Sequence, residues 1–252
     1  MNKNFGKYFY FITLLILAGG FLFWGFLRID FAGKEIESIN FKNYAKFEKE
    51  KPEIIPEFVN LEIPFIPQAP YAIWDKLHDN ACEEAAIIMV YYYLNKKELT
   101  QETAEQEILN MVDWQIKNWG GHFDLDAGKI AELFTSYFSS TSLATGGYQN
   151  INLVYGFTVE DVKKELTDGN PIIIPAAGRL LGNPYFTPPG PEYHALVIKG
   201  YDDEKSEFIV NDPGTKRGAD FRYSYQILET AVHDFNNGDV LAGEKAMIVI
   251  TK

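Results

Sequence analysis

The hydrophobic and polar positions along the chain divide it into an apolar N-terminal run, a charged segment and a longer region with helix and strand patterns. From Tyr8 to Leu27 no residue carries a charge. A stretch of this length is about 30 Å long as a helix, which is roughly the hydrocarbon thickness of a bilayer. We therefore expect a transmembrane anchor at residues 8–27.

The charges around the apolar run predict its orientation. Lys3 and Lys7 precede the run, and this basic bias favours a cytoplasmic N-terminus at residues 1–7, with the remaining chain outside the cytoplasm. The alternative is a cleaved signal peptide, whose apolar region would be shorter, about 7–15 residues. Residues 28–60 alternate in charge and contain two helix-breaking prolines, so we expect a stalk or linker there.

Helical spacing dominates the first part of the remaining region, residues 61–252. A helix is predicted from Ala81 to about Leu94, with an apolar stripe along one face. Asp79 or Asn80 stands where an N-cap is preferred, and Glu83 is placed to close a capping box on Asn80. Further helices are expected over residues 100–112, 126–138, 158–168 and 224–235.

Strand patterns prevail in the second part of this region. Short runs rich in β-forming residues occupy residues 171–174, 193–201, 207–211 and 246–251. Helices first and strands later favour an α+β domain with an antiparallel sheet over an alternating βαβ arrangement.

Composition restricts the classes of function. Hydrophobic residues make up 46% of the 252 residues, which is typical of a folded chain. The formal net charge of −12 argues against a nucleic-acid partner, since phosphate binding needs a basic face. The four histidines include no pair at metal-binding spacing, so we expect neither a metal nor a cofactor. One cysteine, Cys82, excludes an intrachain disulfide.

Cys82 stands in the first turn of the predicted helix at residues 81–94. The unpaired N–H groups of a first turn lower a cysteine pKa and favour the nucleophilic thiolate. Glu83 and Glu84 would have the opposite effect if they faced the sulfur. The alternative is an inert buried cysteine, because free cysteine is among the most buried residue types.

A base for this cysteine is suggested by a predicted β-hairpin. His194 begins one strand, and a turn centred between Asp203 and Glu204 would place it opposite Asp212 to within one residue of register. Opposed side chains on one face lie close enough for a carboxylate to hold an imidazole in one tautomer. Alternatively, Asp212 only starts the turn at Pro213, as aspartate often does.

Cys82, His194 and Asp212 would thus supply a nucleophile, a base and an orienting carboxylate, the parts of a covalent acyl-transfer site. Such a site also needs donors for the oxyanion. The Cys82 backbone N–H is one candidate, and the side-chain amide of Gln68, in a Pro-rich extended segment, is the other.

These segments resemble the C39-like peptidases, papain-like cysteine peptidases related to bacteriocin leader-processing domains. The resemblance covers residues 61–252 and rests on four motifs, Pro67-Gln-Ala-Pro, Asp79-Asn-Ala-Cys-Glu-Glu, Glu192-Tyr-His-Ala-Leu-Val and Asn211-Asp-Pro-Gly. It implies a papain-like fold, with a catalytic helix at the start of the domain and an antiparallel sheet after it. It also implies that Gln68 lines the oxyanion hole, Cys82 attacks, His194 acts as base and then acid, and Asp212 orients it. Many relatives have Cys-Gly-Pro where this chain has Cys82-Glu-Glu.

The function expected from the resemblance is hydrolysis of peptide bonds by a membrane-anchored cysteine peptidase. Its partners would be a peptide or protein substrate and the lipid bilayer. No ATP-binding domain is recognised in the chain, so export of leader peptides is not implied. Two alternatives stay open: a transglutaminase or transpeptidase reaction at the same three residues, and an inactive domain that binds peptides or cell-wall stems.

Overall fold

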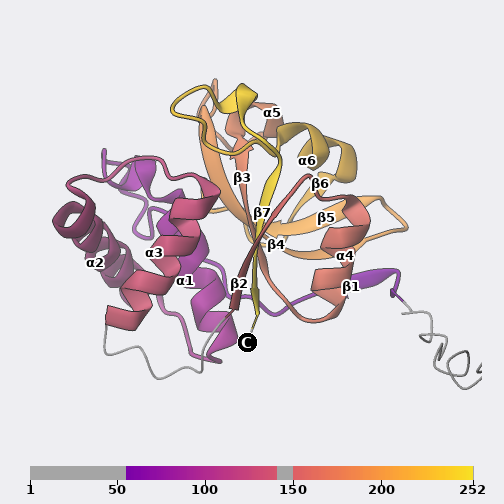
Figure 1. Cartoon of the computed structure of the whole chain (residues 1–252), viewed down its shortest axis with the longest axis horizontal. Helices are drawn as coiled ribbons and strands as arrows, with labels where there is room; N and C mark the ends of the chain where they lie inside the picture. Colours follow the sequence, from indigo (N-terminus) through magenta and orange to yellow (C-terminus); the bar gives the residue numbers. More distant parts are fainter. Residues whose placement is uncertain (1–54, 141–149, 252) are drawn as a thin grey trace, which may run out of the picture. The chain divides into compact units, whose positions relative to one another are not determined.

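The computed structural model describes residues 55–140 and 150–251 (Figure 1). The anchor predicted at residues 8–27 and most of the predicted stalk lie outside these ranges. Within the described residues, no helix is both long enough and apolar enough to cross a bilayer.

An antiparallel sheet of seven strands forms the centre of the described part of the chain. Six strands follow the order β2-β7-β3-β4-β5-β6, and β1 pairs with the end of β4. The strands are β1 (Phe58–Asn60), β2 (Asn150–Tyr155), β3 (Ile172–Ala177), β4 (Tyr193–Asp202), β5 (Glu207–Asn211), β6 (Phe221–Ser224) and β7 (Ala246–Thr251).

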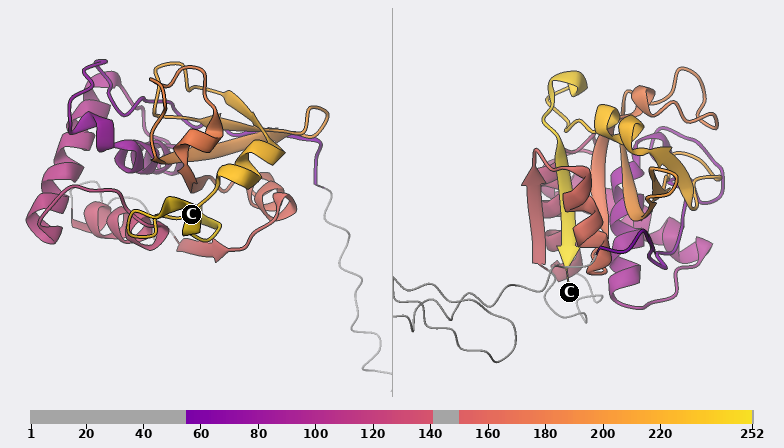
Figure 2. Two further views of the ribbon diagram at one scale, coloured as in Figure 1. Left: turned by 90° about the horizontal axis from the view of Figure 1, so that it is seen from above. Right: turned by 90° about the vertical axis from the view of Figure 1, so that its right-hand side faces the viewer.

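Helices cover both faces of this sheet, as Figures 1 and 2 show. Three long helices lie on one face, and three shorter ones lie on the other. The helices of the first face are α1 (Cys82–Leu94), α2 (Gln101–Trp119) and α3 (Ala127–Ser140). Those of the second are α4 (Val159–Thr167), α5 (Gly178–Leu181) and α6 (Tyr225–Ala231). Two short 3₁₀ helices, η2 (His78–Asn80) and η3 (Val240–Ala242), complete the set.

Alternation along the strands separates two hydrophobic cores. Ile173 and Val197 point to the core of α1, α2 and α3, whereas their chain neighbours Ile172 and Leu196 point to the core of α4 and α6. A strand buried on both sides reads as a continuous apolar run, which is why β3 and β4 show little polar alternation. The mixed arrangement of helices and an antiparallel sheet is the one expected from the sequence.

The predicted first helix is confirmed, but its cap is not. Ala81 is the N-cap of α1, no side chain caps it, and Asp79 and Asn80 belong to η2 instead. Glu83 points into the protein and forms no capping box. The helix is also buried all round rather than along one stripe, because the sheet covers one side and α2 and α3 cover the other.

Other boundaries differ where local signals were weak. The helix α2 continues past residue 112 to Trp119, where Gly120 adopts a left-handed conformation and ends it. The helix α6 is shorter than expected, and the four residues before it form β6. Strand β2 was not expected. Residues 58–60, assigned to the stalk, form β1, so the folded part begins slightly before residue 61.

The β4–β5 hairpin contains an irregularity that matters for His194. Near the turn, Gly200 pairs with Ile209, but beyond Lys199 the register shifts and Ile198 pairs with Val210. One extra residue on a strand moves every later side chain of that strand to the opposite face of the sheet. The bulge at Lys199 therefore decides which side chains of β4 and β5 share a face.

Candidate active site

Cys82 is the first residue of α1 and is buried. Its helix packs across β4, and a hydrogen bond from the backbone of Ala195 reaches the sulfur. The thiol is thus placed at the beginning of β4, beside the residue that follows His194. The helix start and the strand start, 112 residues apart in sequence, meet at one point in the fold.

His194 and Asp212 are in direct contact. The His194 Nε2 and Asp212 Oδ1 atoms are 2.8 Å apart, and both side chains are buried. The two residues are not directly opposed, since the register beyond the bulge would continue to Leu196 opposite Asp212. They are diagonal neighbours on one face, and without the bulge at Lys199 they would point to opposite faces.

Asp212 is held as a carboxylate by a dense set of donors. Besides His194, the Tyr223 hydroxyl donates at 2.7 Å, the Asn183 side-chain amide at 2.9 Å and the Gly214 backbone N–H at 3.0 Å. Burial raises the pKa of Asp212, but the charge and hydrogen bond of His194 and the bonds from Tyr223 and Gly214 outweigh it, and the net pKa is lowered. An ionised Asp212 accepts a hydrogen bond from His194 Nε2–H, which leaves Nδ1 of the neutral ring as an acceptor.

The imidazole ring of His194 lies in a close-fitting pocket. Phe186 packs edge-on against it, with ring centroids 5.4 Å apart. On another side, a Cβ atom added to Gly214 would lie 2.9 Å from His194 Cε1, so only glycine lets the backbone approach the ring this closely. Packing and the Asp212 bond together fix the ring orientation.

Gln68 is buried near the start of α1 and is tied to both halves of the domain. Its backbone N–H donates to the Pro213 carbonyl at 2.9 Å, next to Asp212. Its side-chain Nε2 donates to the carbonyls of His78 at 2.7 Å and Asp79 at 3.1 Å. Both amide protons are therefore engaged, and Gln68 would need to release the longer bond to donate to an oxyanion.

The thiol itself is bonded to Glu83. Cys82 Sγ lies 3.0 Å from Glu83 Oε2, and among the described residues no hydrogen bond joins the sulfur to His194. Burial raises the pKa of Cys82 well above its ordinary value, and the charge of Glu83 raises it further. The helix start therefore does not by itself produce a thiolate, because Glu83 faces the sulfur and favours the uncharged thiol.

Glu84 is buried as well and belongs to a second polar cluster. One of its carboxyl oxygens accepts a short hydrogen bond from Gln115 on α2 and lies 3.3 Å from His122 Nε2. Burial lowers the pKa of His122, but the hydrogen bond and charge of Glu84 outweigh burial, so the net pKa is raised. The contacts of this cluster do not include the His194–Asp212 pair.

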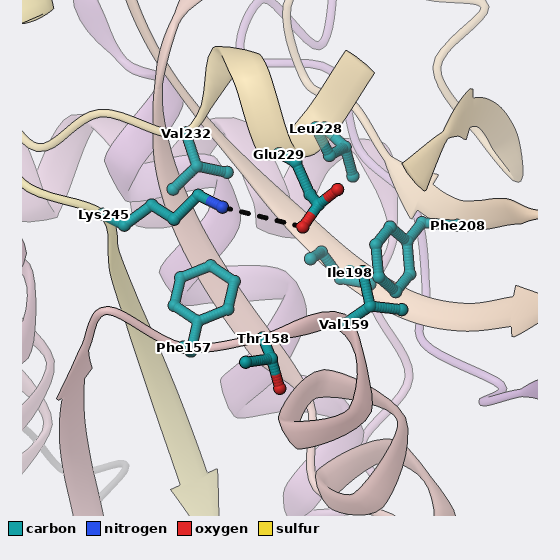
Figure 3. A pocket seen from close by; sticks show the side chains of 9 residues that line it. All are labelled: Phe157, Thr158, Val159, Ile198, Phe208, Leu228, Glu229, Val232 and Lys245. Carbon is teal, nitrogen blue, oxygen red and sulfur yellow. Dashed lines mark ion pairs between the residues drawn. The ribbon is translucent and has the colours of Figure 1, made fainter. Parts of the chain in front are cut away.

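Two cavities lie elsewhere on the described part of the chain, and neither is lined by the four predicted site residues. The cavity in Figure 3 holds about 10 Å³, room for roughly one water. It is closed on one side by the ion pair of Lys245 and Glu229, 3.8 Å apart, and none of the four predicted site residues lines it. A wider groove of about 650 Å³ lies at Tyr92 and Tyr93. That is the far end of α1, about 15 Å along the helix from Cys82.

Sequence reasoning missed two residues around the predicted site, Asn183 and Tyr223. Asn183 lies in the Pro- and Gly-rich segment before His194, and Tyr223 lies in the unexpected strand β6. Both reach Asp212 only through the tertiary fold, so no local pattern indicated them. Gly214, in the Asp-Pro-Gly turn, was visible in sequence as a turn residue. Glu83 was visible as a residue adjacent to Cys82, but its direction was not.

The geometry can be set beside known proteins. The description "Peptidase_C39 like family" matches residues 60–237. Among solved structures, a protein described as a C39-like peptidase from Bacillus anthracis has a TM-score of 0.51 at 17% identity, covering 78% of this chain and 98% of that one. Xylellain, a cysteine protease from Xylella fastidiosa, has a TM-score of 0.42 at 13% identity, covering 79% and 87%. Among curated proteins, none matches.

The family match spans well over half of the chain and includes Gln68, Cys82, His194 and Asp212. The Bacillus anthracis structure, at its low identity, supports the fold alone. The match agrees with the resemblance seen in the four sequence motifs, and on these grounds the chain belongs to the Peptidase_C39 like family.

Proposed function

We propose that this chain is a membrane-anchored cysteine peptidase that hydrolyses peptide bonds outside the cytoplasmic membrane. The observation that carries the proposal is the buried His194–Asp212 pair at 2.8 Å, at the strand end where the Cys82 sulfur meets the Ala195 backbone. A nucleophile at a helix start, a base and a group that orients the base are the parts of a cysteine acyl-transfer site.

The proposed reaction has two halves, acylation of Cys82 and hydrolysis of the resulting thioester, and His194 transfers the proton in both. His194 Nδ1 takes the Cys82 thiol proton, and the sulfur attacks the peptide carbonyl carbon. The imidazolium then gives its proton to the leaving amine, and a thioester remains on Cys82. Water, deprotonated by the same Nδ1, attacks the thioester carbonyl carbon, the C–S bond breaks and the acid is released. The imidazolium then returns its proton to the Cys82 sulfur. Asp212 stays ionised throughout and holds Nε2–H.

Two donors are proposed for the oxyanion of the tetrahedral intermediate. The first is the backbone N–H of Cys82, since the first N–H groups of a helix have no intrahelical acceptor. The second is Gln68 Nε2, which would exchange its 3.1 Å bond to the Asp79 carbonyl for the oxyanion. A residue held by one firm and one long bond can make this exchange without moving its backbone.

The raised pKa of Cys82 favours one rival, a domain that binds peptides without cutting them. The two functions separate in one experiment on the whole chain in detergent. A quenched fluorescent peptide library should be cleaved by the wild type and not by Cys82→Ala, while His194→Ala should lose at least about a hundredfold in kcat/KM. Peptide binding that survives in Cys82→Ala, with no cleavage by the wild type, would support a peptide-binding domain and contradict the peptidase proposal.

Nucleophile activation needs its own measurement. Iodoacetamide labelling of Cys82, followed by intact mass between pH 5 and 7, should be faster in the wild type than in His194→Ala, since the imidazolium stabilises the thiolate. Equal labelling rates in the two proteins would contradict the proposed Cys82–His194 pair.

A further inference from the structure

Two carboxyl groups are buried directly behind the proposed nucleophile. Glu83 and Glu84 are each 1% exposed, although buried glutamates are rare unless they are paired. Glu84 has Gln115 and His122 as partners, as described above. The partners of Glu83 are different, because one of them is the reacting sulfur.

Both oxygens of Glu83 are fixed by single contacts. Oε1 accepts the Leu125 backbone N–H at 2.8 Å, and Oε2 lies 3.0 Å from Cys82 Sγ. The Leu125 carbonyl in turn accepts the Tyr193 hydroxyl, which precedes His194 on β4. The loop before α3 therefore aims one carboxyl oxygen at the sulfur from the side of β4. No cation contacts this carboxyl among the described residues.

The charge on Glu83 is set by its surroundings. Burial raises its pKa most, and the nearby carboxylate of Glu84 raises it further, to about 8. Asp124 adds to this rise, while the contacts of Cys82 and the Leu125 amide oppose it. The remaining groups that face the cluster are His122, through Glu84, and the Tyr193 hydroxyl.

We propose that Glu83 is a positioning residue that controls Cys82, a role that rests on the proposed peptidase function. As a carboxylate it accepts the thiol S–H bond and keeps the sulfur uncharged and turned from His194. As a carboxylic acid it keeps its proton, donates a hydrogen bond to the sulfur and stabilises the thiolate beside the imidazolium. One side chain thus switches the nucleophile between a resting and a reactive form.

The protons balance with one exchanged to solvent. In the reactive form, Glu83 is protonated, Cys82 is a thiolate and His194 is an imidazolium. When Glu83 loses its proton to solvent, the imidazolium proton returns to the sulfur, giving a thiol, a neutral imidazole and a carboxylate. The reactive form therefore predominates on the acid side of the Glu83 titration and is lost as the pH rises.

This gives an unusual signature in cysteine labelling. An isolated thiol reacts with iodoacetamide faster as the pH rises, because only the thiolate attacks. In this protein the labelling rate of Cys82 should fall about tenfold between pH 6.5 and 9, because Glu83 loses its proton within this range. Glu83→Gln keeps the size of the side chain and offers N–H to the sulfur, so in this variant the fall should disappear.

Glu84→Gln provides the matched control at the neighbouring buried carboxyl. It leaves the contact between Glu83 and the sulfur in place but removes a charge that raises the Glu83 pKa. The fall in labelling should therefore persist and move to lower pH. Should Glu83→Gln not fold, the wild-type profile and Glu84→Gln still decide the matter.

A wild-type labelling rate that does not fall with pH, as expected for Glu83→Gln, would overturn the role of Glu83. If peptides are still cleaved and labelling still depends on His194, the peptidase proposal survives that result. Conversely, the labelling rate could fall with pH in the wild type and not in Glu83→Gln, while no peptide is cleaved. That result would support the role of Glu83 and contradict the peptidase proposal.

Discussion

At the scale of single residues, the His194 ring is held from several sides. Asp212 fixes Nε2, Phe186 packs on the ring, and Gly214 lets the backbone come within contact distance. Tyr223 and Asn183 do not touch the ring, but they hold Asp212 in place. The orientation of one imidazole thus depends on residues from β4, β6 and two loops.

Gly214→Ala tests how closely the ring position is set. The added Cβ would lie 2.8 Å from Phe186 Cε1 and 2.9 Å from His194 Cε1, so both rings must shift. We expect kcat/KM for peptide cleavage to fall at least about tenfold, because misplaced catalytic groups lose rate steeply. The midpoint of thermal unfolding should change little, whereas kcat/KM falls.

The control for this variant is Gly128→Ala in α3, where the new Cβ would meet an Asp126 oxygen at 3.2 Å, away from His194. Activity should be kept there. Wild-type kinetics in Gly214→Ala would show that the ring tolerates displacement and that the close approach has no catalytic role.

At the scale of elements, β4 connects the site to the rest of the sheet. Its beginning carries His194, and its end pairs with β5 on one side and with β1 on the other. Gly200 permits the approach of β1, because a Cβ there would lie 2.2 Å from the Val59 carbonyl oxygen. Residues before 61 therefore belong to the fold and pair with the strand on which the proposed base is placed.

A fragment that begins at residue 61 should accordingly be less stable than one that begins at residue 54. It loses the bond from the Asp203 N–H to the Glu57 carbonyl and that from the Tyr201 hydroxyl to the Pro56 carbonyl. At about 0.5–1.5 kcal/mol each, these two bonds predict a loss of about 1–3 kcal/mol before the β1 ladder is counted. Urea unfolding of the two fragments measures the difference, and equal midpoints and slopes would show that β1 contributes nothing.

At the scale of the whole molecule, residues 54–252 form one compact unit with two cores, one on each face of the sheet. The family match covers residues 60–237 and so includes most of both cores, but not β7, which contributes to each. The proposed site is built from α1 on one side and the β4 and β5 ends on the other. Peptidase chemistry would therefore depend on the packing of the whole sheet against α1.

Membrane attachment is the prediction that belongs to this scale. The full chain should stay in the membrane pellet after a carbonate wash, because about 20 apolar residues resist extraction, whereas the 54–252 fragment should be released. External protease added to intact cells should then reach the folded part, as the lysines before the run predict. Release of the full chain by carbonate to the extent of the fragment would contradict the anchor.

Much of the secondary structure could be predicted from sequence because its signals are local. The capping box of Thr158 and Asp161 begins α4 as expected, and the limits of β5 and β7 agree with their apolar runs. The same local reading placed Cys82 at a helix start and His194 at a strand start. It also brought His194 and Asp212 within reach of each other, although the exact register was off by two residues.

The sequence by itself determined the helix and strand order and the candidate residues, since spacing, caps and turns act over a few positions. Only the tertiary structure decided the direction of side chains whose partners lie far along the chain. The bulge at Lys199 put His194 and Asp212 on one face, and β6 brought Tyr223 to Asp212. The burial of α1 on all sides turned Glu83 from an expected cap into a partner of the sulfur, because an apolar environment forces a carboxyl to find whatever donors the fold supplies.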